Sequence, residues 1–141
     1  MKIQSIRAHL DKKEQIFNLL AQLTSAFSLD DDRFNNIITN LPIGHHIFVY
    51  IIEGKIVGMI TMLIEQKLIH NGASIVHIED LVVDKEYRGS GIGKELVEYC
   101  MRQITSDKYY KIILNCSKEL IPFYEKLGFK ERNVQMSRYL S

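Results

Sequence analysis

A strand, a glycine-rich loop and the start of a helix follow one another in residues 76–93, and this junction constrains the fold most. The apolar run Leu81-Val82-Val83 passes through a polar turn into Arg88-Gly89-Ser90-Gly91-Ile92-Gly93, where a helical pattern begins. The start of a helix offers free backbone N–H groups and the positive end of the helix dipole. The sequence therefore predicts a phosphate-binding loop at this point.

A short glycine loop before a helix can also be an ordinary turn, so the loop alone does not identify a ligand. It lacks the Lys-Ser/Thr pair of a P-loop, and its glycine spacing differs from the G-x-G-x-x-G fingerprint. We therefore expect neither nucleotide hydrolysis nor dinucleotide binding.

The bulk properties narrow the class of protein. The length of 141 residues suits one domain spanning residues 1–141, and 18 Lys and Arg against 17 Asp and Glu give no basic excess for nucleic-acid binding. Cys100 and Cys116 have no metal-ligand or disulfide spacing, so we expect no metal. No signal peptide and no apolar run of about 18 residues is visible. A cytoplasmic protein is expected, with the nucleus left open.

Hydrophobic periodicity predicts the order of the elements. The first part should hold a strand in residues 2–9, a helix opened by an Asp11–Glu14 capping box and running to about Ser25, and a second helix that starts at Asp30–Asp32 and is ended by Pro42-Ile43-Gly44. Three antiparallel strands should follow at 46–52, 55–70 and 73–83, with turns at Glu53-Gly54-Lys55 and Asn71-Gly72.

After the glycine loop we expect a helix from 92 to 104, a strand at 109–116, a short helix at 122–127 and strands at 129–130 and 134–140. The run Ile112-Ile113-Leu114 suits a strand buried on both faces. The strand–helix–strand order implies a right-handed crossover and a locally parallel pair. The predicted fold class is α+β (mixed α/β), with a central mixed, mostly antiparallel sheet flanked by helices.

Two motifs resemble the GNAT superfamily of N-acetyltransferases. Arg88–Gly93 is similar to its acetyl-CoA motif, Gln/Arg-x-x-Gly-x-Gly/Ala, and Ile121–Phe129 is similar to its later motif with a tyrosine on a helix. The segments 65–70, 77–83 and 109–116 resemble those members that acetylate glucosamine 6-phosphate. This resemblance implies the GNAT acyl-CoA N-acyltransferase fold and direct acetyl transfer from acetyl-CoA to the 2-amino group, in a ternary complex. The product, N-acetylglucosamine 6-phosphate, would serve UDP-GlcNAc synthesis, and the enzyme would be a homodimer.

The resemblance also implies roles for residues. Tyr124 would donate a proton to the departing thiolate, and the backbone carbonyl of Asn115 would receive the substrate amine. The residues expected to bind acetyl-CoA are Leu81, Val82, Val83, Arg88, Gly89, Ser90, Gly91, Ile92, Gly93, Lys94, Tyr124 and Lys126.

On the acceptor side, the resemblance assigns Glu79 and Asp80 to the amine and hydroxyls of the sugar, since carboxylates suit a cationic amine. The phosphate would be held by Thr24, Lys67, His70 and Arg138, with Arg138 reaching into the other subunit, and Tyr110 and Lys111 would line the edge of the site. His77 lies inside a strand and is expected to be a sheet histidine with a partner. This chain departs from the residues common in the family directly after Thr24, at Leu120 and at Tyr139.

Other functions stay open on the sequence alone. The chain could acetylate another small amine or a peptide N-terminus, it could be an acetyl-CoA sensor without catalysis, or it could be a module that binds a partner protein. Turnover with a panel of amines distinguishes the first two from the expected activity.

Overall fold

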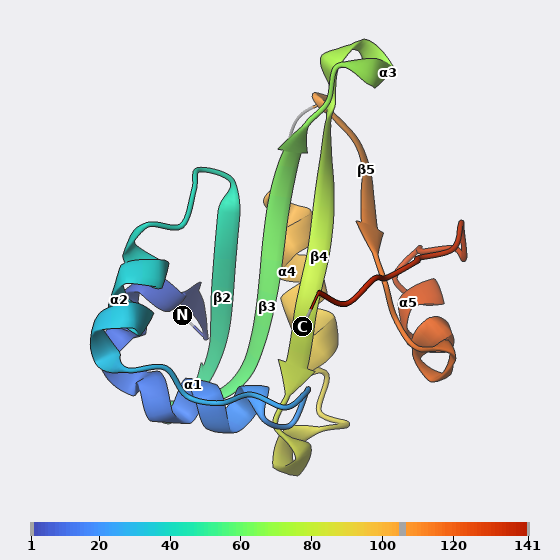
Figure 1. Cartoon of the computed structure of the whole chain (residues 1–141). Helices are drawn as coiled ribbons and strands as arrows, with labels where there is room; N and C mark the ends of the chain where they lie inside the picture. Colours follow the sequence, from blue (N-terminus) through green and yellow to red (C-terminus); the bar gives the residue numbers. More distant parts are fainter. Residues whose placement is uncertain (1, 105–106, 141) are drawn as a thin grey trace.

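The computed structural model describes residues 2–104 and 107–140, which are arranged around one sheet with the strand order β1-β2-β3-β4-β5 (Figure 1). The first four strands are antiparallel to their neighbours, and β4 and β5 are parallel. The strands are β1 Ile3–Ser5, β2 His45–Ile52, β3 Lys55–Gln66, β4 Ser74–Val83 and β5 Tyr109–Leu114. This mixed sheet confirms the predicted α+β class and the parallel pair late in the chain.

Helices cover both faces of the sheet. The long helix α4 lies behind β3 and β4 in Figure 1, and α1 and α2 lie on the opposite face. The helices are α1 Lys13–Leu20, α2 Asp31–Thr39, α3 Ile69–Gly72, α4 Ile92–Arg102 and α5 Ile121–Glu125, with 3-10 turns η1 Ile6–Lys12, η2 Lys85–Tyr87 and η3 Lys118–Leu120. The predicted helix after the glycine loop is thus confirmed.

Each face of the sheet has its own apolar core. On the α4 face, Leu96, Val97 and Cys100 are completely buried against the sheet. A Cβ on Gly58 of β3 would lie only 3.0 Å from Cδ1 of Leu96, so the absence of a side chain at Gly58 lets α4 approach the sheet. The other core joins α1 and α2 to β2 and β3 through Ile16, Leu19, Phe34, Ile38, Val49, Ile56 and Met59.

The predictions for the N-terminal part are only partly correct. The first strand ends at Ser5, and because Asp11 lies inside the following 3-10 turn, the Asp11–Glu14 capping box does not form. Helix α1 ends at Leu20 instead of near Ser25. Asp30 does cap α2, since its Oδ1 accepts a 2.8 Å hydrogen bond from the Arg33 amide, and α2 ends at Thr39, ahead of the expected Pro42-Ile43-Gly44 stop.

The two predicted hairpins form, with one difference. Glu53 and Gly54 have positive φ angles, as a tight turn requires. The β3–β4 turn is longer than expected because β3 ends at Gln66, whose side-chain amide donates to the carbonyls of Lys67 and Gly72 and closes the loop. The turn contains α3, in which His70, Asn71 and Gly72 all have positive φ.

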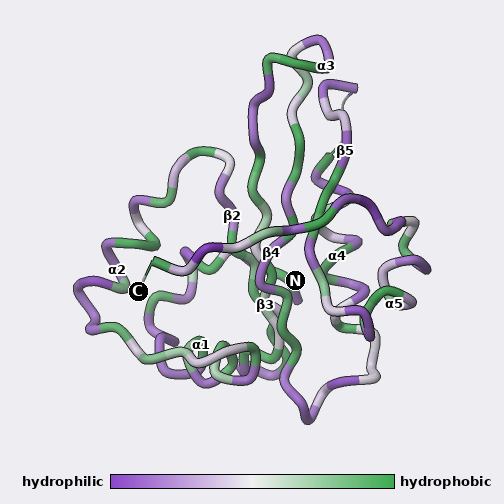
Figure 2. The backbone as a smooth tube through the Cα atoms, turned by 45° about the vertical axis from the view of Figure 1, so that its right-hand side comes forward, coloured by the Kyte–Doolittle hydropathy of each residue, from purple (hydrophilic) through white to green (hydrophobic). Residues whose placement is uncertain are grey.

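The C-terminal segment is where the sequence prediction fails. Neither residues 129–130 nor residues 134–140 form strands; the chain instead passes from α5 across the front of β4 (Figures 1 and 2). Within the described residues β5 is therefore an edge strand, and Ile112-Ile113-Leu114 is half-buried instead of buried on both faces. The large apolar side chains of this segment are 88% to 92% exposed: Val134, Met136, Tyr139 and Leu140.

Candidate active site

Strand β4 has a β-bulge at its centre. Glu79 pairs with Thr61 and Val82 pairs with Met59, so Asp80 and Leu81 together lie opposite a single residue of β3. Asp80 has a φ of +51°, which few non-glycine residues adopt. The bulge places the half-buried Glu79 and the exposed Asp80 in the middle of an otherwise apolar strand.

Strands β4 and β5 separate just before the bulge. Their pairing ends at Ile78 and Leu114, whereas β4 remains paired with β3 as far as Val83. One edge of residues 79–83 therefore has no strand partner in the described part of the chain, and it presents backbone N–H and C=O groups. The exposed Asn115 follows directly on the β5 side of this opening. Because Leu81 and Val83 pack onto the α4 core and Val82 onto the other core, an extended ligand would meet their backbone only.

The glycine loop forms an open cradle at the N-terminus of α4. Gly89 and Gly91 have φ angles of +84° and +87°, and a Cβ on either glycine would meet no atom within 4 Å. A Cβ on Gly93, in contrast, would lie 3.5 Å from the ring of Phe123, so Gly93 allows α4 and α5 to pack closely. This open loop at the start of a helix of eleven residues fits a pyrophosphate group.

The basic residues predicted around this cradle are all exposed. Arg88 donates from Nε to the carbonyl of Val83 at 3.1 Å, and Lys94 forms a 3.8 Å ion pair with Glu98. Lys126 lies at the C-terminal end of α5. Arg88 precedes the cradle and Lys94 follows it in the first turn of α4, so two cationic residues flank it in the chain.

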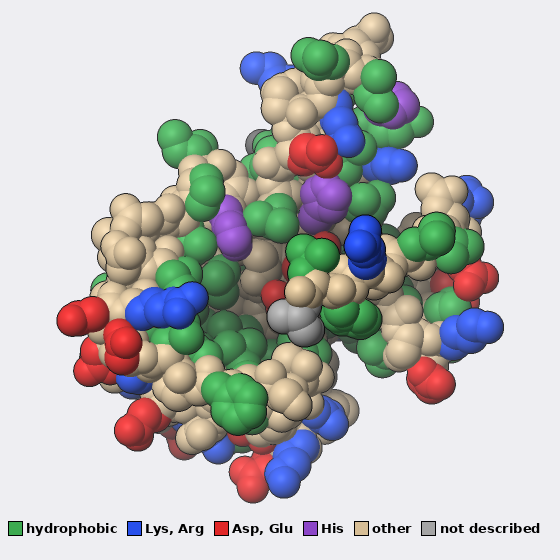
Figure 3. Space-filling view, viewed as in Figure 1, with side chains coloured by type: hydrophobic (Ala, Val, Ile, Leu, Met, Phe, Trp, Pro, Cys, Tyr) green, Lys and Arg blue, Asp and Glu red, His purple; other side chains and the backbone are tan. Residues whose placement is uncertain are grey.

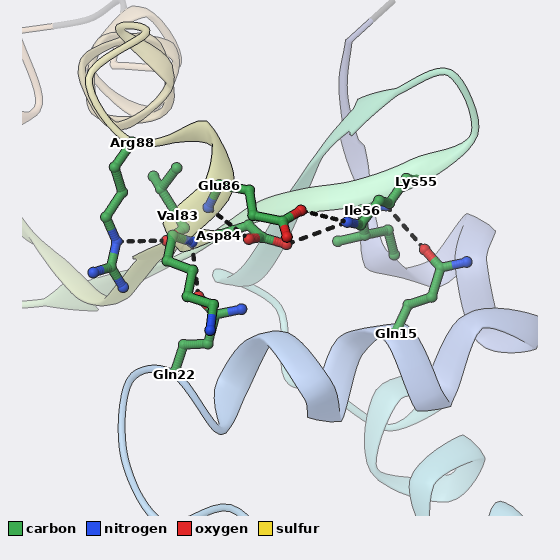
Figure 4. Close-up of polar contacts among 9 residues, drawn as sticks. Gln15, Gln22, Lys55, Ile56, Val83, Asp84, Glu86 and Arg88 are labelled. Carbon is green, nitrogen blue, oxygen red and sulfur yellow. Dashed lines mark hydrogen bonds and ion pairs between the residues drawn. The ribbon is translucent and has the colours of Figure 1, made fainter.

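A buried polar anchor, which sequence reasoning missed, fixes the end of β4 (Figure 4). Asp84 is 8% exposed; its Oδ1 accepts a 3.0 Å hydrogen bond from the Glu86 amide, and its Oδ2 lies 3.5 Å from Nζ of Lys55. The Glu86 amide, followed by Lys55, holds the pKa of Asp84 below its usual value. Gln22, two residues after the last residue of α1, accepts a hydrogen bond from the Lys85 amide at 2.8 Å. An Asp two residues before a Glu, directly after an apolar strand, was the available signal for this cap.

Tyr124 lies on α5 between two aromatic rings. Phe123 and Phe129 pack edge-on against it at centroid distances of 4.9 and 5.9 Å, and only 7% of Tyr124 is exposed. Burial, the larger cause, and the charge of Cys116 together raise the pKa of Tyr124 to about 12. The phenol is therefore protonated at neutral pH. Among the described residues no buried side-chain polar atom lacks a partner, and no side chain there bonds to the Tyr124 hydroxyl. The hydroxyl therefore reaches the protein surface as a free donor.

The predicted phosphate-binding residues are not brought together in one chain. Lys67 forms a 3.0 Å ion pair with Glu65, whereas His70 stacks on Tyr110 at 3.6 Å near the tip of the hairpin, beside a cavity of about 480 Å³. Thr24 follows α1, toward the other end of the sheet, and the exposed Arg138 lies on the C-terminal segment. Lys111 lies over the Tyr110 ring at 5.9 Å.

In residues 2–104 and 107–140, no group of three or more His, Cys, Asp or Glu side chains is placed to hold a metal ion. No helix in these ranges is long and apolar enough to span a membrane.

Comparison with known proteins identifies the family. A model of the acetyltransferase (GNAT) domain matches residues 44–131. The chain belongs to the GNAT acetyltransferases. It is 38% identical over 134 residues to a glucosamine 6-phosphate N-acetyltransferase of Arabidopsis thaliana, covering 92% of this chain and 90% of that one. A protein of the same name from Trypanosoma brucei brucei is 39% identical over 121 residues, covering 84% and 82% of the two chains.

The fold agrees with this assignment. The crystal structure of glucosamine-6-phosphate N-acetyltransferase from Arabidopsis thaliana matches with a TM-score of 0.92 and 36% identity, covering 99% of this chain and 98% of that one. The prediction of a GNAT acetyltransferase fold is therefore confirmed over nearly the whole chain. The chain is an acetyltransferase, and the two glucosamine 6-phosphate N-acetyltransferases compared above come from a plant and a protozoan.

Proposed function

We propose that this acetyltransferase moves the acetyl group of acetyl-CoA to the 2-amino group of glucosamine 6-phosphate, directly and within a ternary complex. The observation that carries the proposal is the layout of β4. Two carboxylates at the bulge, Glu79 and Asp80, are followed at once by an unpaired strand edge and then by the glycine cradle. An amine and an acyl donor would thus meet end to end along one strand, and the names of the relatives point to this amino sugar.

On the donor side, the cradle of Gly89 and Gly91 accommodates the pyrophosphate of acetyl-CoA, and the unpaired edge of residues 79–83 can hydrogen-bond to the amides of the pantetheine arm. Binding energy from these remote contacts would position the thioester. Tyr124 is the donor available for the sulfur, since its hydroxyl is protonated and unpartnered by side chains in the described part of the chain.

On the acceptor side, the carboxylates at the bulge favour a cationic amino sugar by charge. Asn115 leaves β5 at the point where the strands separate, so its backbone carbonyl is available to receive the amine. This arrangement needs no acyl-enzyme, because the amine and the thioester can both reach the opening between β4 and β5.

We further propose that the enzyme is a homodimer with shared sites. The C-terminal segment exposes Val134, Met136, Tyr139 and Leu140 almost completely, and such side chains favour a protein partner over water. The open edge of β5 is a natural place for a strand from a second copy. A second copy would also explain why the phosphate-binding residues, Arg138 among them, are scattered in one chain. A molar mass of one chain in light scattering would contradict the dimer.

The test of the proposed reaction is release of free thiol from acetyl-CoA with glucosamine 6-phosphate, non-phosphorylated glucosamine and other amines as acceptors. We expect turnover with the phosphorylated sugar and much weaker turnover with glucosamine. Turnover with another amine but not with glucosamine 6-phosphate would refute the assignment. Thermal stabilisation by CoA without turnover of any amine would identify a sensor instead.

A further inference from the structure

Three charged or ionisable side chains form a connected row on the face of the sheet opposite α4. One carboxylate oxygen of Glu65 lies 3.0 Å from Nζ of Lys67, and the other lies 2.9 Å from Nε2 of His77. Figure 3 shows basic, acidic and histidine side chains in this order below the hairpin tip. Glu65 thus bridges two partners with its two oxygens.

The register of β3 and β4 produces this bridge. Glu65 lies opposite Ile75, and His77 lies opposite Leu63, so Glu65 and His77 are diagonal neighbours on one face of the pair. The hydrogen bond from His77 is the largest of the effects that hold the pKa of Glu65 below its usual value, and Lys67 acts in the same direction. The carboxylate is therefore ionised across the neutral range.

The bridge sets where the Lys67 ammonium lies. The side chain of Lys67 is 29% exposed although the residue lies just past the end of β3, where a lysine would ordinarily extend into water. Its backbone is fixed as well, because Gln66 donates to the Lys67 carbonyl at 2.8 Å. Glu65 uses one N–H of the ammonium and leaves two for another acceptor.

The row leads toward the bulge. His77 and Glu79 lie two residues apart on the same face of β4, about 7 Å along the strand. Glu65 therefore draws the Lys67 ammonium back from the hairpin tip, toward the carboxylates assigned to the amine. His70, three residues after Lys67, instead stacks on Tyr110 at the tip.

We infer that Glu65, held in place by His77, is a positioning residue that presets Lys67 for the phosphate of the acceptor. This inference rests on the proposed function. Charge alone and positioning predict opposite effects of removing the Glu65 charge. A carboxylate repels a phosphate dianion, so removing its charge should by itself tighten phosphate binding. Loss of the positioning of Lys67 should weaken phosphate binding, because the substrate must then order a long side chain.

The experiment is a double-mutant cycle with Glu65→Gln and Lys67→Met. Glutamine has one acceptor oxygen and cannot hold both partners. We expect Glu65→Gln to raise the KM for glucosamine 6-phosphate about three- to ten-fold, the factor for ordering one long side chain. The KM for acetyl-CoA, kcat, and the kcat/KM for non-phosphorylated glucosamine should change less than about two-fold. In the Lys67→Met background there is no ammonium to position, so Glu65→Gln should no longer raise the KM for the phosphorylated sugar and should leave it unchanged or slightly lower by charge alone.

The control is Asp31→Asn, which removes a 2.6 Å ion pair with Lys13 at the start of α2, and neither residue has been assigned to the site. It should leave every kinetic constant unchanged. A lowered KM in Glu65→Gln, an equal loss with both sugars, or additive effects with Lys67→Met would overturn the positioning role while leaving the proposed function intact. Failure of the wild type to use glucosamine 6-phosphate would overturn the proposed function, and this inference with it.

Discussion

Replacing Tyr124 by Phe removes one hydroxyl and leaves the surrounding ring packing in place. The edge-on contacts with Phe123 and Phe129 involve the ring, and no described side chain bonds to the hydroxyl. No buried donor or acceptor loses a partner, so the free energy of unfolding should change by less than about 1 kcal/mol. A fall in activity can then be assigned to the hydroxyl itself.

The size of the expected fall follows from the pKa of Tyr124. Burial raises this pKa to about 12, whereas an ordinary thiol has a pKa of about 8.5. Complete proton transfer from the phenol to a thiolate would thus be unfavourable by roughly 5 kcal/mol, at about 1.4 kcal/mol per pKa unit. Tyr124 is therefore expected to donate a hydrogen bond to the developing thiolate without transferring its proton completely. A hydrogen bond to a charged group contributes about 1.5–3 kcal/mol. Tyr124→Phe should therefore lower kcat about 10- to 150-fold.

The assay is steady-state thiol release by wild type and Tyr124→Phe, with thermal unfolding as the control for folding. Because the pKa of Tyr124 is raised, its hydroxyl stays protonated until the pH approaches 12, so it should cause no loss of kcat between pH 7 and about 10. An unchanged kcat in Tyr124→Phe would remove the residue from the chemistry. A loss above about 10³-fold would show that the phenol does more than donate one hydrogen bond.

Three further substitutions test the donor end, the acceptor end and the core separately. Arg138→Ala should raise the KM for glucosamine 6-phosphate without changing that for acetyl-CoA; equal effects would contradict the assignment. Gly91→Ala places a Cβ at a φ of +87°, at a strain of about 1–2 kcal/mol, and should raise the KM for acetyl-CoA selectively. Leu96→Ala empties a fully buried position and should lower the free energy of unfolding by about 2–5 kcal/mol in urea titrations.

The local structure of the proposed donor side was predictable because short stretches of sequence determine it. Positive φ at Gly89 and Gly91, the helix that follows and the strand through Leu81–Val83 all follow from short-range pattern. The anchor at Asp84 was less visible, since its partners Lys55 and Gln22 come from distant parts of the chain. Long-range side-chain pairs of this kind leave no periodicity in the sequence.

The C-terminal part shows a different limit. The apolar run in β5 predicted a strand buried on both faces, and residues 134–140 were predicted to form a strand, yet β5 is a half-buried edge strand and residues 134–140 form no strand and are exposed. A hydrophobic pattern reports that a surface will be covered, but it does not say by which chain. The homodimer proposed above would cover both surfaces and reconcile the pattern with the single-chain structure.

The bulge at Asp80 ties the fold to the proposed chemistry. Val76 and Ile78 face the α4 core, so regular alternation would next direct Asp80 into that core and leave Leu81 and Val83 on the other face. The extra residue shifts the alternation by one: Leu81 and Val83 reach the α4 core and Asp80 is exposed. Pairing with β5 stops at Ile78, just before the same point. The rearrangement that keeps a carboxylate out of the core therefore lies where the strand edge opens, and it puts the carboxylate proposed to bind the amine next to the strand edge proposed to bind the acyl donor.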